Sequence, residues 1–179
     1  MPPDDPRSNY RLVRETLLDR LEQPPAAVHR VEGERGAPAA AALYEAALAG
    51  VTLSFALNGI GTDGHTASLF PGSPALAERV HRAVATEPGL DPLVERVTLT
   101  PSVFAGTELL VYLAAGEEKA AAVRRAFAEP PSVATPASLV RGRRTIALLD
   151  PAAGSLLQGN RRGAGPSRTA RRRRPQLPS

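Results

Sequence analysis

The chain has 179 residues, 42% of them hydrophobic, which suits one α/β domain with a buried core and is too short for two full domains. It contains no cysteine, which excludes disulfides and thiolate chemistry, and no apolar run long enough to cross a bilayer. The formal net charge is +4, and the opening MPPDDPRSNY lacks the apolar stretch of a signal peptide, so we expect a soluble, cytoplasmic protein with no membrane partner.

Two helices are expected in the first fifty residues. SNYRLVRETLLDRL (8–21) has apolar residues at helical spacing, and Ser8 or Asn9 is well placed to cap it. A loop with a short extended piece at 28–31 follows. PAAAALYEAALAG (38–50) predicts a second helix, with a proline in its first turn and a glycine at its end.

Strands and helices then alternate. VTLSFALNG (51–59) is mostly apolar from 51 to 57 and ends in glycine, which predicts a strand buried on both faces of a parallel sheet. The remaining candidate strands are RVHRAVAT (79–86), RVTLTPSV (96–103), ELLVYLAAG (108–116) and RRTIALLD (143–150). The remaining helical candidates are EEKAAAVRRAFAE (117–129) and the single turn PASLV (136–140).

This alternation predicts an α/β fold, a Rossmann-like and mostly parallel sheet flanked by helices. The chain opens on a loop and a helix, whereas a doubly wound sheet usually begins with a strand. We therefore expect the first strands to be missing and assign residues 1–157 to a partial α/β domain.

The basic charge lies at the C-terminal end. Residues 158–179 hold seven of the 22 basic residues and no acidic one, which leaves 15 basic against 18 acidic residues, a net charge of −3, in 1–157. The segment is rich in Gly, Pro, Ser and Arg, so we predict a disordered basic tail. Binding of nucleic acid through this tail is one hypothesis. Because no aromatic residues alternate with its arginines, we expect no specific nucleic-acid partner.

The stretch GIGTDGHTASLFPGSP (59–74) is the most informative part of the sequence. It follows an expected parallel strand and so lies at the carboxyl edge of the sheet, where open α/β sheets bind ligands. Asp63 can hold the ring of His65 in one tautomer while that ring takes a proton from water. From the residues alone, a tight turn capped by His65 is the alternative. No second histidine stands at ligand spacing, so we expect no metal.

The segment GIGTDGHTASLFPGSPAL resembles the signature of the 6-phosphogluconolactonases, sugar-phosphate lactone hydrolases of the pentose phosphate pathway. PPDDPRSNYRLVRETLLDRL, RVTLTPSV, GEEKAAAVRRAF and PASLV also fall in that family's order, so the resemblance covers roughly residues 2–157. The related glucosamine-6-phosphate deaminases share Gly-x-Asp-Gly-His but continue with Ile-Ala-Phe-Asn-Glu-Pro-Gly. This chain has TASLFPG there and lacks the glutamate, which favours the lactonases.

The resemblance implies hydrolysis of 6-phospho-D-glucono-1,5-lactone to 6-phosphogluconate, without metal or organic cofactor, and we expect a monomer. His65 would be the general base for attack of water on the lactone carbonyl, and Asp63 would orient it. Amides around three glycines would bind the sugar acid or the oxyanion, and Lys119 would bind the phosphate. The expected substrate-binding residues are Gly59, Gly61, Gly64, Thr66, Lys119 and Asn9.

The sequence also departs from the family. The family's first strand, its glycine-rich phosphate turn and its Asp-Glu-Arg arginine would all lie upstream of Pro2, so we expect an N-terminally truncated, weakly active or inactive enzyme. Asn58 stands where the family has an apolar strand residue. The alternative function is a non-catalytic sugar-phosphate-binding remnant, or an interaction module of the same fold.

Overall fold

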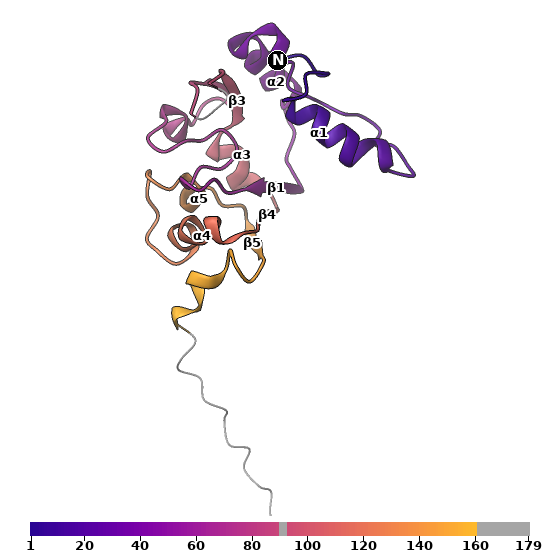
Figure 1. Ribbon diagram of the computed structural model, residues 1–179. Helices are drawn as coiled ribbons and strands as arrows, with labels where there is room; N and C mark the ends of the chain where they lie inside the picture. The colour runs from indigo at the N-terminus through magenta and orange to yellow at the C-terminus, as the bar shows by residue number, and fades with distance from the viewer. Residues whose placement is uncertain (90–92, 161–179) are drawn as a thin grey trace, which may run out of the picture.

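A three-stranded parallel sheet forms the centre of the computed structural model, which describes residues 1–89 and 93–160 (Figure 1). The strands lie in the order β1-β4-β5 and are β1 (Phe55–Gly59), β4 (Leu109–Ala114) and β5 (Arg144–Leu149). Gly59 pairs with Leu113, which pairs with Leu148, so all three carboxyl ends meet at one edge. This confirms the predicted α/β class and its parallel sheet.

Only one face of this sheet is well covered. Leu110 and Tyr112 of β4 are fully buried on that face, against residues of α3 (Pro101–Gly106), α4 (Ala120–Phe127) and α5 (Pro136–Leu139). On the opposite face, Phe55 and Leu57 of β1 are 54% and 59% exposed. The prediction of a first strand buried on both faces is therefore wrong, because the helices of the described residues pack on a single side.

The other two strands form a separate ribbon. β2 (Ala83–Thr86) and β3 (Arg96–Leu99) are antiparallel, with Ala83 opposite Leu99. The sequence predicted both as extended but did not predict their antiparallel pairing. The connection of residues 87–95 is shorter than the dozen or more residues that a parallel crossover needs, so the chain can only return antiparallel.

The ribbon is joined to the N-terminal part of the chain through α2 (Ala37–Ala47), which packs against it. The carboxylate of Glu45 accepts hydrogen bonds from the N–H groups of Arg82 and Ala83, each at 2.7 Å. Figure 1 shows α1 and α2 at the end of the molecule opposite to α4 and α5. The ribbon therefore links the N-terminal helices to the region of the sheet.

The first helix, α1 (Asn9–Thr16), begins where the sequence places it. The hydroxyl of Ser8 accepts a hydrogen bond from the Arg11 amide at 3.3 Å, which confirms Ser8 as the cap. The helix is shorter than predicted and continues as the 3-10 helix η1 (Leu18–Arg20). The extended piece expected at 28–31 forms no strand.

Four further 3-10 helices complete the fold: η2 (Gly33–Arg35), η3 (Pro74–Ala77), η4 (Glu117–Lys119) and η5 (Ser155–Asn160). The last of these extends over the first three residues of the predicted tail, and residues 161–179 of that tail lie outside the described residues. No helix within 1–89 and 93–160 has the length and apolar character to span a membrane.

Candidate active site

The loop after β1 is a compact turn closed by its own backbone. The N–H of Gly61 donates to the carbonyl of His65 at 2.9 Å, and the N–H of Gly64 donates to the carbonyl of Gly61 at 2.9 Å. Gly64 has a φ of +94°, which favours glycine. Both amides therefore take part in closing the turn.

Asp63 and His65 form a close pair within this turn. Asp63 Oδ1 lies 2.6 Å from Nδ1 of His65 and also accepts the His65 backbone N–H at 3.1 Å. Burial raises the pKa of Asp63, but the two hydrogen bonds from His65 more than offset it, so the net pKa is lowered. An ionised Asp63 accepts the proton of Nδ1, which leaves the lone pair of Nε2 available as a base.

Gly61 leaves the space that this pair occupies. A Cβ added at Gly61 would lie 2.0 Å from His65 Nδ1 and 2.5 Å from Asp63 Oδ1, closer than any real contact. The His65 ring also packs against Phe70, with ring centroids 5.0 Å apart. The sequence motif predicted the contact between Asp63 and His65. It did not indicate that Gly61 leaves space for these two side chains, or that Phe70 packs against the His65 ring.

A cavity of about 580 Å³ opens beside His65. Its walls include Asn9 of α1, Gly59 at the end of β1 and Arg96 at the start of β3. The volume falls within the usual range for small-molecule sites. The structure thus brings the predicted residues Asn9, Gly59 and His65 to one cavity and adds a cation, Arg96, that sequence reasoning missed.

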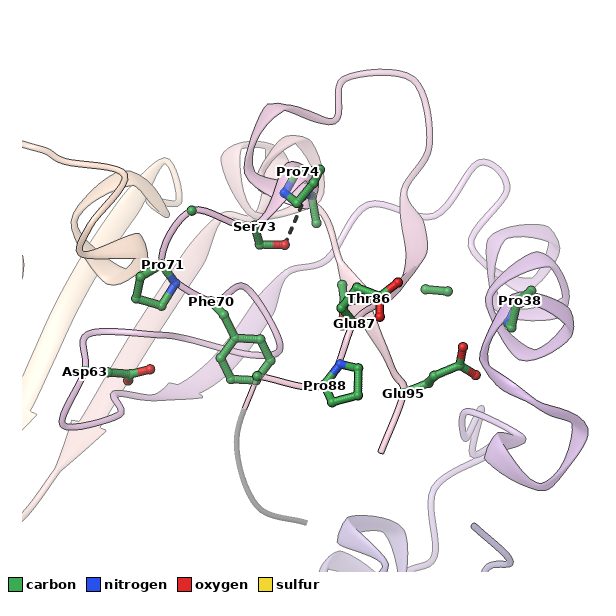
Figure 2. A pocket seen from close by; sticks show the side chains of 14 residues that line it. Pro38, Asp63, Phe70, Pro71, Ser73, Pro74, Thr86, Glu87, Pro88 and Glu95 are labelled. Atoms are coloured by element: carbon green, nitrogen blue, oxygen red, sulfur yellow. Dashed lines mark hydrogen bonds between the residues drawn. The ribbon is translucent and has the colours of Figure 1, made fainter. Parts of the chain in front are cut away.

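A second cavity, of about 550 Å³, is also bordered by residues of this loop (Figure 2). Asp63 and Phe70 border it on one side, and Pro38 and Glu95 lie opposite them. Its described lining contains three carboxylates, Glu87 among them, and no basic side chain. This lining disfavours an anionic ligand in the second cavity.

Five predicted residues lie outside the lining of the cavity beside His65: Asp63, Gly61 and Gly64 of the turn described above, and also Thr66 and Lys119. Thr66 is fully buried, and its hydroxyl donates to the carbonyl of Gly59 at 2.9 Å, so that group is engaged with the protein itself. Lys119, in η4, follows β4, the strand next to β1, and so lies at the same sheet edge. Nearby in the chain, Arg125 of α4 donates to the carbonyl of Thr62 at 3.0 Å and ties that helix to the loop.

The described residues contain no group of three or more His, Cys, Asp or Glu side chains arranged to hold a metal ion. The chemistry that this site offers is acid–base chemistry. His65 can accept a proton at Nε2, an ionised carboxylate fixes its ring, and a cavity of ligand size lies beside it.

Comparison with known proteins agrees with this geometry. The family of glucosamine-6-phosphate isomerases/6-phosphogluconolactonase matches residues 1–148. The 6-phosphogluconolactonase of Streptomyces coelicolor is 36% identical over 174 residues, covering 88% of this chain and 66% of that protein. The 6-phosphogluconolactonase of Rattus norvegicus is also 36% identical, with 88% and 64% covered. The chain thus spans slightly less than two thirds of the length of these relatives.

Solved structures give the same result. The 6-phosphogluconolactonase from Leishmania guyanensis is 30% identical with a TM-score of 0.70, covering 86% of this chain and 70% of that one. The one from Thermotoga maritima is 29% identical with a TM-score of 0.71, covering 83% and 67%. Because the family match covers most of its length, the chain belongs to the glucosamine-6-phosphate isomerase/6-phosphogluconolactonase family.

Proposed function

We propose that this protein hydrolyses 6-phospho-D-glucono-1,5-lactone to 6-phosphogluconate, in the oxidative pentose phosphate pathway. The observation that carries the proposal is the 2.6 Å contact between Asp63 and His65 at the wall of a cavity of ligand size. The names of the relatives support the choice of substrate. We also propose that the protein acts on this small metabolite as a monomer in the cytoplasm, without a membrane or nucleic-acid partner.

The reaction needs one proton carrier and no cofactor. Nε2 of His65 takes a proton from water as the water oxygen bonds to the lactone carbonyl carbon, which becomes tetrahedral with a negatively charged oxygen. When the carbonyl re-forms, the bond to the ring oxygen breaks and that oxygen receives the proton from Nε2. The product carries a new carboxyl group and a new hydroxyl, so one water is consumed and His65 is regenerated.

Binding of the substrate is assigned to the same sheet edge. Gly59 and Asn9 line the cavity and are placed to contact the sugar acid. Arg96 also lines this cavity, and we assign the phosphate to Lys119, which precedes α4. Gly61 and Gly64 are assigned to holding the loop, since their amides are already bonded within it.

The test compares the wild-type chain with the His65→Gln variant on freshly made lactone, after subtraction of spontaneous hydrolysis. Loss of a general base costs about 10²- to 10⁴-fold in rate, so we expect His65→Gln to lose turnover while its affinity for 6-phosphogluconate, measured by calorimetry, stays close to wild type. His81→Gln, at an exposed histidine outside the cavity, is the matched control.

Two outcomes would contradict the proposal. A wild-type chain that binds 6-phosphogluconate without accelerating hydrolysis is a sugar-phosphate-binding protein of the same fold. The uncovered sheet face is the observation that favours this second function. Equal turnover by wild type and His65→Gln would remove His65 from the mechanism.

A further inference from the structure

Thr66 follows His65 in the chain, yet its side chain turns away from the cavity into the protein. It is fully buried, and its Oγ1 takes part in two hydrogen bonds. The hydroxyl donates to the carbonyl of Gly59 at 2.9 Å and accepts from Nδ2 of Asn58 at 3.1 Å. A hydroxyl has one proton to donate, so the Asn58 amide must be the donor in the second bond.

These bonds close the catalytic loop into a ring. Gly59 is the last residue of β1 and Thr66 is the first residue after His65, so their bond spans the whole turn that carries Asp63. The loop is held from the other side as well, because the carbonyl of Gly64 accepts the N–H of Ala137 at 2.9 Å. His65 thus lies between two anchored neighbours, and its own carbonyl accepts the N–H of Gly61 at 2.9 Å.

The network rests on the covered face of the sheet. Asn58 pairs in register with Tyr112 of β4, which is fully buried and donates to the carbonyl of Val140 at 3.0 Å. The residues around Tyr112 on this face are otherwise mostly apolar. Buried polar groups stabilise one specific arrangement only when their hydrogen bonds are satisfied. Here the hydroxyl of Thr66 satisfies both the amide of Asn58 and the carbonyl of Gly59.

We propose that Thr66 is a positioning residue that fixes the backbone of His65 and so keeps its ring at Asp63, rather than a residue that contacts the substrate. This inference rests on the proposed function for its kinetic consequence but not for its structural one. Without the hydroxyl, the loop loses its side-chain bond between residues 59 and 66 and keeps only its backbone bonds, so the 2.6 Å contact of Asp63 with His65 is held less firmly.

The test is the Thr66→Val variant, which replaces the hydroxyl by a methyl group at nearly constant volume. Thr107→Val is the matched control, because Thr107 is also fully buried and its hydroxyl donates to the carbonyl of Val103 at 3.0 Å, at the end of α3. Thr66→Ser retains the hydroxyl and serves as the conservative rescue.

The first measurement is the ¹⁵N NMR spectrum of the histidine rings at alkaline pH, with the His65 signals assigned by their loss in His65→Gln. Wild type, Thr66→Ser and Thr107→Val are expected to show His65 with its proton on Nδ1. Thr66→Val is expected to show a mixture of the two tautomers. A single, wild-type tautomer in Thr66→Val would overturn the inference whatever the enzyme kinetics show.

The second measurement is steady-state kinetics on the lactone. Misplacing a catalytic group slightly costs up to about 100-fold, so we expect Thr66→Val to lower kcat by about 10- to 100-fold with KM nearly unchanged. A rise in KM at constant kcat would mean that Thr66 contacts the substrate and would also overturn the inference. Absence of wild-type turnover would defeat the proposed function alone, since the NMR result still decides the role of Thr66.

Discussion

Within the loop that follows β1, the carboxylate of Asp63 is balanced between burial and hydrogen bonding. Burial raises its pKa, but the hydrogen bonds from the backbone and ring N–H groups of His65 lower it by more. The net pKa of Asp63 therefore lies below 3.8. The pair therefore stabilises the folded state above about pH 3.8, and that contribution is lost as the pH falls through the lower, folded-state pKa. At neutral pH the carboxylate is ionised and determines which nitrogen of His65 carries the proton.

The Asp63→Asn variant tests this role. Its amide group can donate to Nδ1 of His65, which would move the ring proton to Nε2 and remove the base. We expect kcat to fall by about 10²-fold or more, as for other catalytic histidines that lose their orienting carboxylate. The measurement is kcat together with the ¹⁵N spectrum of the His65 ring. Asp19→Asn, at an exposed carboxylate in η1, is the control, and a fully active Asp63→Asn would show that the ring needs no carboxylate.

At this residue scale the sequence was informative where contacts are local. Asp63 and His65 are two positions apart, so their contact follows from chain geometry. The hydrogen bonds of the Gly61 and Gly64 amides within the turn were not predicted, because they depend on how tightly the turn closes. Arg96 could not be predicted at the cavity, since the position of its ribbon beside the loop after β1 is a long-range property.

Among the connecting elements, the turn between η3 and β2 depends on one carboxylate. Oε1 of Glu78 accepts hydrogen bonds from the N–H groups of Arg79, Val80 and His81 at 2.8, 2.6 and 3.0 Å. Three donors on one carboxylate lower the pKa of Glu78 to about 2, led by the bond from His81. The turn is thus stabilised above about pH 4.5, and this stabilisation is lost as the pH falls through about 2.

We expect Glu78→Gln to lower the Tm at neutral pH, because an uncharged amide oxygen is a weaker acceptor for three N–H groups. The loss should shrink as the pH is lowered towards 2, where the wild-type carboxyl is also protonated. Thermal unfolding followed by circular dichroism at several pH values measures both effects. Glu22→Gln, at an exposed residue, should leave the Tm unchanged, and an equal Tm loss at every pH would argue against the charge of Glu78.

Elements were predictable where their signals are local. Ser8 caps α1, and apolar runs that end near glycine mark β1 and β4. The boundaries of β1 were less well predicted, because an apolar run from 51 to 57 does not show where pairing with β4 begins. The antiparallel pairing of β2 with β3 went unpredicted, although the short connection between them requires it.

For the whole molecule, the most consequential feature is the uncovered sheet face. Leu57 of β1, Leu113 of β4 and Leu148 of β5 lie on it and are 59%, 55% and 53% exposed. The apolar pattern correctly predicted that β4 is buried on the face that the helices cover. No sequence pattern shows whether a second layer covers the opposite face. Contiguous apolar surface of this kind usually marks an interaction or aggregation site.

This face should bind the apolar dye ANS, and the double variant Leu113→Thr/Leu148→Thr should bind less of it. The two residues are neighbours in register, and threonine keeps a high strand propensity while it replaces apolar surface. Val80→Thr is the control, because Val80 is 83% exposed in a turn away from the sheet. Fluorescence titration with ANS, with sedimentation velocity on the same samples, measures dye binding and self-association together. If the double variant and Val80→Thr bind ANS equally, this sheet face is not the main exposed apolar surface of the protein.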